Sequence, residues 1–437
     1  MKYLFTDARL LDGRLNDKQK MPVQEHMSIA VDGEKITGIY RDGDAPQEGY
    51  TKVDLKGKYL MPGLINMHVH TIGRGEAPKP VTGKVDYKAI FSALTATEEK
   101  KQETLKMVLG ILKMHLYSGV TTLRTVGGLQ DLDGIARDMI AEGKAEGPRV
   151  LSCNTAISVP GGHMAGSVAT ESASVEDALK DLDKIIASKV DWVKLMITGG
   201  VMDASAEGEP GVLRMPPEMV KAVCDKAHSL GYRVCSHVES PEGVRVALEN
   251  GVDTIEHGAK PDQRIIDLFK ERGAADICTI SPAAPYALMP DSMTHSGEIG
   301  QKNGGIVMHG IIDCARACLD NGIPVGLGTD AACNFITPYD MWRELDYFVK
   351  YDKVSHDFAL HTATQVNAQI LHLDDQIGTV ETGKCADFLV TEYNPLDDFA
   401  AMRQPAMVVA KGRIIDKPVI DRLPDVDKAL DDLRAEI

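Results

Sequence analysis

The sequence predicts an α/β fold: a (β/α)8 TIM barrel with a small β-sandwich domain built from the N- and C-terminal segments. The first observation is an alternation between residues 104 and about 370, where stretches of helical periodicity each lead into a short apolar β-type stretch. The second is that these β-type stretches, together with the apolar run 64–67, number eight, as a closed barrel requires. The third is that both ends of the chain read as strands and turns without intervening helices.

The barrel prediction depends on seven helical stretches, at residues 104–117, 131–142, 174–188, 216–230, 241–250, 262–272 and 308–321. They lead into β-type stretches at residues 119–124, 149–152, 191–196, 233–237, 253–257, 275–279 and 324–330. An open doubly wound sheet is the alternative architecture. We disfavour it because the sequence contains neither a GxGxxG opening nor a Walker loop.

The small β domain is expected to have two parts. Residues 1–60 form its N-terminal part, residues 61–372 form the barrel, and residues 373–437 form its C-terminal part with a charged terminal helix from residue 421. In the N-terminal part, Asp32-Gly33 is a hairpin signal between two apolar stretches. Because both parts read as strands and turns, we expect them to pair into one domain.

Composition limits the partners of the chain. It has 437 residues and a net charge of -16, which argues against nucleic acid or an anionic membrane surface as a partner. No stretch reaches the ~18 unbroken apolar residues of a membrane span, and the N-terminus does not read as a signal peptide. The eight cysteines are scattered without a CxxC pair, and Cys314 and Cys318 read as core residues of a helix. These features favour a cytoplasmic protein with reduced thiols.

A long excursion follows the first barrel strand. Residues 71–103 begin irregularly, with glycines and prolines at Gly73, Gly75, Pro78, Pro80 and Gly83. Loops of this length at such a place shape a pocket or contact another subunit. Both roles stay open, and the second would make the protein a homo-oligomer.

Two histidines end the first barrel strand. The turn residues Pro62-Gly63 precede an apolar run that leads to His68 and His70. Alternate side chains of a strand share a face, so both imidazoles are able to bind one metal ion. The alternative is two exposed or hydrogen-bonded histidines, and the decision depends on further ligands downstream.

Further metal-ligand types follow at the ends of other predicted strands. They are Lys194, His237, His257 and Asp330. In barrels of this kind, active sites lie at the carboxyl ends of the strands, so the set predicts a metal site there. A lysine repels a cation unless CO₂ converts its amine to a carbamate, which is an anion able to bridge two metals. The alternative is a lysine that snorkels or pairs with an acid.

This string of residues resembles the amidohydrolase superfamily with a binuclear metal centre. The resemblance covers nearly the whole chain, including the turn at residues 383–387. Residues 193–200 and 161–163 are similar to the prolidase and dipeptidase branch, which is related to imidazolonepropionase.

The resemblance implies a ligand set. His68, His70 and Asp330 would hold one divalent metal, His237 and His257 the second, and carbamylated Lys194 would bridge them. A hydroxide between the ions would be the nucleophile, and one metal would polarise the scissile carbonyl. Asp330 would be catalytic, accepting the proton and passing it to the leaving amine. Zinc suits these ligands, and iron, cobalt and manganese also fit.

Two further residues are expected to contact the substrate. In the resembled branch, a residue placed like His163 faces the substrate, so we assign it to substrate or oxyanion contact; the alternative is an exposed loop histidine. Many branch members carry Tyr two residues after the ligand His237, where this chain has Glu239. This carboxylate is suited to a substrate ammonium or guanidinium group, or it caps the next helix. The departure argues against strict Xaa-Pro specificity.

The leading functional hypothesis is a metal-dependent amidohydrolase that cleaves an amide C–N bond in a dipeptide or N-acyl amino acid. The second hypothesis is a cyclic-amide or imidazolone hydrolase, or a deaminase of the same superfamily. Imidazolonepropionase-type members use one metal and lack the bridging lysine, so Lys194 argues against this reading. The third is a catalytically silent scaffold or binding relative. The number of metal ions per chain discriminates among the three hypotheses. Two ions favour the first, one ion favours the second, and no ion favours the third.

Overall fold

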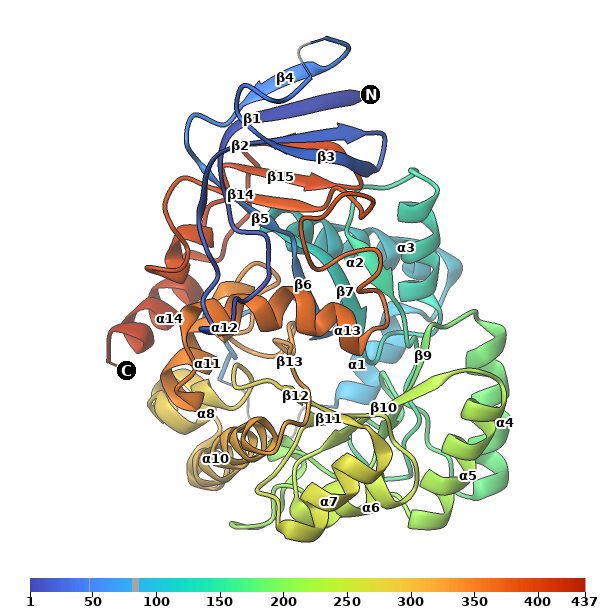
Figure 1. Ribbon diagram of the computed structural model, residues 1–437. Helices are drawn as coiled ribbons and strands as arrows, with labels where there is room; N and C mark the ends of the chain where they lie inside the picture. Colours follow the sequence, from blue (N-terminus) through green and yellow to red (C-terminus); the bar gives the residue numbers. More distant parts are fainter. Residues whose placement is uncertain (47, 81–85, 437) are drawn as a thin grey trace. The chain divides into compact units, whose positions relative to one another are not determined.

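The computed structural model describes residues 1–46, 48–80 and 86–436 (Figure 1). The chain divides into two compact units. The first unit comprises residues 1–66, 113–123 and 338–421, and the second comprises residues 67–112, 124–337 and 422–437.

All eight β-type stretches expected in the barrel are strands. They are β6 (Leu64–Val69), β7 (Val120–Thr125), β8 (Arg149–Leu151), β9 (Trp192–Met196), β10 (Arg233–Val238), β11 (Thr254–His257), β12 (Ala275–Cys278) and β13 (Val325–Leu327). They form a five-stranded parallel sheet in the order β13-β12-β11-β10-β9 and a three-stranded sheet in the order β6-β7-β8.

Backbone hydrogen bonds continue beyond the edges of both sheets. The N–H of His70, just after β6, donates to the carbonyl of Ala331, which follows β13, at 3.0 Å. The N–H of Met196 in β9 donates to the carbonyl of Ile157, which follows β8, at 2.9 Å. The edge strands of one sheet are thereby bonded to segments that extend the other.

Most of these strands are buried along their whole length. Every residue of β6, β7, β9, β11, β12 and β13 is buried. A parallel sheet covered on both faces favours continuous apolar runs. The polar residues inside these runs are therefore costly unless they have partners, which makes them informative about a site.

The helices predicted between these strands are confirmed. They are α2 (Glu98–Tyr117), α3 (Leu132–Ala141), α4 (Val175–Ala187), α5 (Pro217–Ser229), α6 (Pro241–Glu249), α7 (Gln263–Arg272) and α10 (Gly297–Asp320). Local chemistry sets their ends: Ser240 caps α6 by accepting from the N–H of Gly243, and α7 ends at Gly273 with φ +63°.

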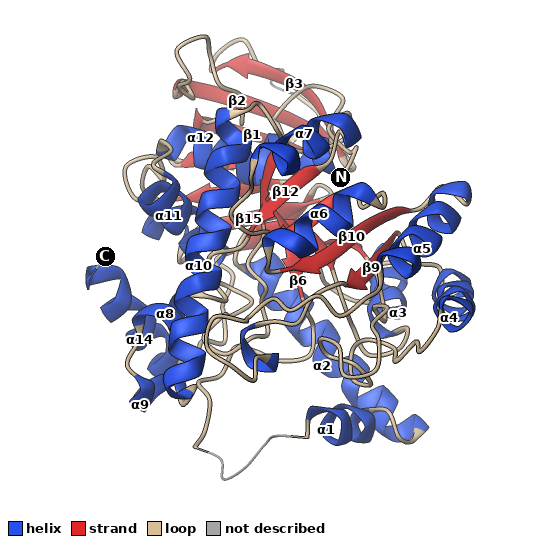
Figure 2. Cartoon of the chain, turned by 90° about the horizontal axis from the view of Figure 1, so that it is seen from below, coloured by secondary structure: helices blue, strands red, loops and turns tan. Residues whose placement is uncertain are grey.

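Helix α10 begins earlier than the predicted residue 308. Its first part contains four glycines, which hide the helical periodicity. One of them has a packing reason, because a Cβ on Gly304 would lie 2.7 Å from the Cβ of Tyr286 in α8 (Ala284–Leu288). Figure 2 shows α10 as a long helix beside α8 and the short α9 (Asp291–Thr294).

The strands near both chain ends form one sheet of the first unit. Its order is β16-β15-β14-β5-β1-β2-β3, with β4 also paired to β1. The bounds are β1 (Lys2–Leu10), β2 (Gln24–Asp32), β3 (Lys35–Arg41), β4 (Thr51–Asp54), β5 (Tyr59–Pro62), β14 (Phe388–Thr391), β15 (Met407–Ala410) and β16 (Arg413–Asp416).

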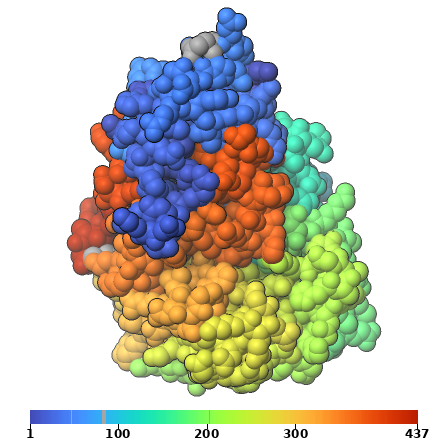
Figure 3. Space-filling model, in the orientation of Figure 1, coloured from blue at the N-terminus to red at the C-terminus, as the bar shows by residue number. Residues whose placement is uncertain are grey.

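The pairing of the two chain ends occurs at β5 and β14, which are antiparallel with Pro62 opposite Phe388. Phe388 packs edge-on against Phe5 of β1 with ring centroids 5.7 Å apart. The blue N-terminal and orange-red C-terminal segments accordingly lie side by side at the surface in Figure 3. The expected pairing of both ends is confirmed, while the two-layered sandwich stays a prediction.

The remaining helices include α1 (Tyr87–Leu94), α11 (Met341–Asp352), α12 (His356–His361), α13 (Asn367–Ile370) and the predicted terminal helix α14 (Pro424–Glu436). Gly83 of the predicted excursion lies outside the described residues. Among the residues that are described, no helix combines the length and apolar character needed to cross a bilayer.

Candidate metal centre

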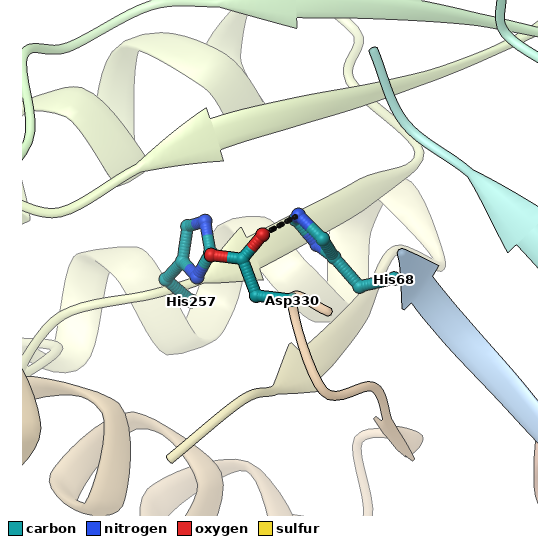
Figure 4. Close-up of side chains that lie close together, drawn as sticks. All are labelled: His68, His257 and Asp330. Carbon is teal, nitrogen blue, oxygen red and sulfur yellow. Dashed lines mark ion pairs between the residues drawn. The ribbon is translucent and has the colours of Figure 1, made fainter. Parts of the chain in front are cut away.

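His68, His70 and Asp330 converge on one point (Figure 4 shows His68 and Asp330). The Nε2 atom of His70 lies 3.1 Å from Asp330 Oδ1, and the Nε2 atom of His68 lies 3.4 Å from the same oxygen. The backbone N–H of Asp330 donates to the carbonyl of His68 at 2.8 Å, which holds the two segments together. Donor atoms around one zinc ion lie about 3 to 3.5 Å apart, so these distances fit a shared ion.

Hydrogen bonds on the far side of the rings orient them. Nδ1 of His70 donates to the carbonyl of Gly127 at 2.7 Å, and Nδ1 of His68 lies 2.7 Å from a carboxylate oxygen of Glu256. Both oxygens only accept, so the ring protons are on Nδ1 and the lone pairs on Nε2 face Asp330. His257 is held similarly, with Nδ1 2.7 Å from Thr279 Oγ1.

The surroundings of the Asp330 carboxylate show whether a cation fits between these residues. Its Oδ1 is buried and has no well-aligned hydrogen-bond partner among the described residues, although two ring nitrogens lie beside it. Burial would raise the pKa of this carboxyl, but His68 and His70 hold it well below its ordinary value, so it is ionised. A carboxylate oxygen that two imidazole nitrogens face at 3.1 and 3.4 Å is a donor set suited to a metal cation.

His237 and His257 form a second set beside the first. Their ring centroids are 4.7 Å apart, and His257 is 4.8 Å from His68. Nε2 of His237 lies 3.2 Å from the carbonyl of Gly199, which leaves Nδ1 for a ligand. Burial, followed by charged neighbours that include Lys194, lowers the pKa of both rings well below the ordinary value. The neutral form is the one that binds metal.

Lys194 is buried in β9, with 1% of its surface exposed. It lies close enough to His237 and His257 for its charge to lower the pKa of both. Within the described part of the chain, its ammonium has no ion-pair partner within 4.0 Å. The alternative of a lysine that pairs with an acid has no support from this structure.

Two of the expected ligands have a strained backbone. His257 has φ +72° and Asp330 has φ +58°, which is the left-handed region that costs an L-residue roughly 1–2 kcal/mol. His257 is the last residue of β11, and Asp330 follows β13 closely. Strain that the surrounding fold maintains at the ends of two strands is typical of functional positions.

His163 stacks on His237 with the ring planes 1° apart and the centroids 4.0 Å apart. Its Nδ1 is hydrogen-bonded to Asp203, which also accepts from the N–H of Gly200 at 3.0 Å. His163 therefore lies beside the centre rather than in an exposed loop. Sequence reasoning did not select Asp203, because nothing along the chain links it to His163.

Glu239 has one buried oxygen, Oε2, without a hydrogen-bond partner among the described residues. Burial, then the charges of Asp330 and Asp203, raise its pKa well above the ordinary value. The cap of α6 is Ser240, so the helix-cap interpretation of Glu239 is wrong. These surroundings favour the neutral carboxyl group near the centre, and a cation beside it would restore the carboxylate.

Sequence reasoning also missed Arg124 and Glu256, which lie fully buried next to His68. Burial alone would raise the pKa of Glu256, but Arg124 at 2.6 Å and the His68 ring lower it far below the ordinary value. A charged residue inside an apolar strand is a signal that the sequence does contain. The sequence does not show that Arg124 and Glu256, which belong to different strands, contact each other.

Comparison with known proteins identifies the family. The profile of the amidohydrolase family matches residues 59–415, which is more than half of the chain. The chain belongs to the amidohydrolase family. This amidohydrolase is therefore an enzyme of a hydrolase family, and the predicted family is confirmed.

Several known proteins resemble this amidohydrolase. The structure of a Bifidobacterium longum protein provisionally described as a prolidase is 33% identical, covers 99% of this chain and 98% of its own, and has a TM-score of 0.85. The structure of a Xaa-Pro dipeptidase with bound methionine in its active site is 26% identical. The match covers 95% of this chain and 100% of the dipeptidase chain, with a TM-score of 0.80. Ochratoxinase of Aspergillus niger is 24% identical, over 87% of this chain and 80% of its own. Imidazolonepropionases also match.

Proposed function

We propose that this amidohydrolase uses two divalent metal ions to cleave the C–N bond of a dipeptide or N-acyl amino acid, as a prolidase-like dipeptidase. The observation that carries this proposal is the convergence of His68 Nε2 and His70 Nε2 on one oxygen of Asp330. His237 and His257 lie beside them, and their pKa values favour the neutral, metal-binding form.

The residues would share the metals as follows. His68, His70 and Asp330 would hold one ion, and His237 and His257 would hold the other. Lys194, buried without an ion-pair partner among the described residues, is suited to conversion by CO₂ into a carbamate that both ions share. Imidazole and carboxylate ligands favour zinc.

When bound, the two cations supply an activated water and polarise the scissile carbonyl. Asp330, whose ionised form is favoured, would accept a proton from the attacking water and pass it to the leaving amine. His163, held by Asp203 on one face of His237, presents its ring to the substrate. Glu239 offers its unpartnered oxygen to a cationic group of the substrate.

The relatives support a peptide-like substrate, because one is provisionally described as a prolidase and another as a Xaa-Pro dipeptidase. Matching imidazolonepropionases keep the cyclic-amide hydrolase as the second candidate. The buried Lys194 argues for two metals and against that candidate. A silent scaffold is disfavoured because every predicted ligand is present.

Several wider features belong to the same proposal. The backbone bonds from His70 to Ala331 and from Met196 to Ile157 support closure of the eight strands into a barrel. This barrel would comprise residues 61–372, flanked by the two parts of a β domain. We further propose a cytoplasmic, homo-oligomeric enzyme that acts on small molecules.

A metal assay combined with a substrate screen tests the proposal. The purified chain is loaded with zinc, cobalt or manganese and assayed against dipeptides, N-acyl amino acids and cyclic amides. We expect about two metal ions per chain and release of an amino acid from a dipeptide. One metal with activity only on cyclic amides would support the second candidate, and absence of both metal and activity would support the scaffold.

A further inference from the structure

A buried chain of hydrogen bonds runs behind His68. Its Nδ1 lies 2.7 Å from Glu256 Oε2, while Oε1 of the same carboxylate accepts from Arg124 Nη2 at 2.6 Å. Thr254 Oγ1 donates to Glu256 Oε1 at 2.7 Å and accepts from Arg124 Nη1 at 3.1 Å. Arg124 also donates its Nε–H to the carbonyl of Met67 at 2.9 Å. The network thereby joins β6 and β7 of the three-stranded sheet to β11 of the five-stranded sheet.

The network is dry. Arg124 and Glu256 are each 0% exposed, and the guanidinium also lies 4.7 Å from the centre of the Trp192 ring. An apolar pair of similar volume often stabilises a fold as well as a buried ion pair does, because the ion pair must be desolvated. Stability alone is therefore a weak reason for this pair.

We propose that Glu256 is a positioning residue that fixes the tautomer of His68, and that the ion pair with Arg124 fixes which oxygen of Glu256 faces the ring. This inference rests on the metal centre proposed above. The carboxylate only accepts, so it holds the ring proton on Nδ1 and keeps the lone pair of Nε2 directed at Asp330, 3.4 Å away. Both oxygens of Glu256 are needed, because Oε2 accepts from His68 while Oε1 accepts from Arg124.

The role of the two oxygens makes a near-isosteric variant informative. In Glu256→Gln, the guanidinium of Arg124, which only donates, binds the single amide oxygen. The amide NH₂ then faces His68 Nδ1 and donates to it, which moves the ring proton to Nε2. A protonated Nε2 is no longer a ligand. Because His68 serves only one of the two ions, only that ion is weakened.

The test is a metal titration of the full chain. Wild type and Glu256→Gln are stripped with a chelator and dialysed against buffers of stepped free Zn²⁺, and zinc per chain is measured by mass spectrometry. Wild type is expected to bind two ions. In Glu256→Gln one ion binds with unchanged affinity and the other binds about 10–100-fold more weakly.

Two further variants separate positioning from support of the fold. Thr254→Val removes a hydroxyl from the same buried network without touching His68, so both zinc affinities are expected to stay within about twofold of wild type. Glu256→Asp shortens the carboxylate by one methylene, so it does not span Arg124 and His68. It is expected to weaken the same ion as Glu256→Gln, and it decides the question if Glu256→Gln does not fold.

The outcomes are distinct. Selective weakening of one ion in the Glu256 variants, with both ions retained in Thr254→Val, supports the inference. Two ions of unchanged affinity in the Glu256 variants overturn it while leaving the proposed function intact. Equal loss of both ions in Glu256→Gln and Thr254→Val also overturns it, since the network would then only support the fold. A wild-type chain that binds no zinc removes the proposed function, and this inference with it.

Discussion

Two groups of buried side chains in the second unit contain metal-ligand types, and their surroundings differ. The histidine group consists of His68, His257 and Asp330, and the cysteine group consists of Asp276, Cys314 and Cys318. In each group the ligand atoms lie within 4.8 Å of one another, and every member is buried. Distance and burial alone therefore do not distinguish them.

The positions of the protons distinguish the cysteine group from the histidine group. In the cysteine group the thiol of Cys314 donates to Asp276 Oδ1 at 3.5 Å. A hydrogen bond with Cys318, together with burial, raises the pKa of the Cys314 thiol well above its ordinary value, so it stays protonated. In the histidine group the proton of His68 is on the far side of the ring, and lone pairs face Asp330. A group whose members donate to one another is a packed core, whereas a group of facing acceptors is suited to a cation.

The largest expected effect comes from breaking the histidine group. Asp330→Asn keeps the shape but removes the charge that faces His68 and His70. We expect turnover to fall at least about a thousandfold, with a melting temperature near that of wild type. His237→Ala is expected to behave alike. Retention of most activity in either purified variant would contradict the ligand assignment.

Lys194→Ala tests the shared ligand between the two sets. We expect loss of bound metal, because no carbamate can form, and partial recovery of activity when acetate or formate is added. Metal content and activity are measured with and without the added acid. Lys302→Ala, at an exposed lysine, is the control and should change neither. Metal retention without rescue would argue against a carbamate.

Glu239→Gln tests the acceptor that has no partner. If its oxygen binds a substrate cation, kcat/KM for dipeptides with a basic group falls by about thirtyfold, or roughly 2 kcal/mol, while neutral dipeptides change little. The measurement is a matched series of substrates that differ only in that charge. An equal loss for both classes would remove the specificity role.

His115 is a buried imidazole outside both groups, and both of its nitrogens lack a partner among the described residues. Burial lowers its pKa to about 3, below the unfolded value near 6.5. The unfolded chain therefore binds the proton first. The contribution of neutral His115 to the free energy of unfolding is fully present above pH ~6.5. Below that pH the free energy of unfolding falls by about 1.4 kcal/mol per pH unit. Urea unfolding should show a loss of roughly 2 kcal/mol at pH 5 that His115→Leu abolishes.

The smallest effect is expected in the cysteine group. Cys314→Ser keeps a donor for Asp276, so the free energy of unfolding should fall by only about 1 kcal/mol, and metal content should not change. Chemical denaturation and metal analysis check this. A drop in bound zinc would show that the cysteine group is a site, and the distinction drawn from its protons would be lost.

The pattern of the fold was accessible from the sequence because periodicity and turn chemistry act over short stretches. The eight β-type stretches and the helices between them lie close to where they were expected, and the pairing of both chain ends followed from their shared strand character. The start of α10 was missed because four glycines obscure its helical periodicity, and one of them, Gly304, is there for contact with Tyr286 of another helix.

For the centre, the sequence by itself determined which residues were able to bind a metal, since His68, His70 and Asp330 each end an apolar strand. Only the tertiary structure decided where their protons and lone pairs point. That direction is set by Glu256 for His68 and by the carbonyl of Gly127 for His70, and these contacts arise only when distant segments pack. Residue type is local information, while hydrogen-bond direction belongs to the folded chain.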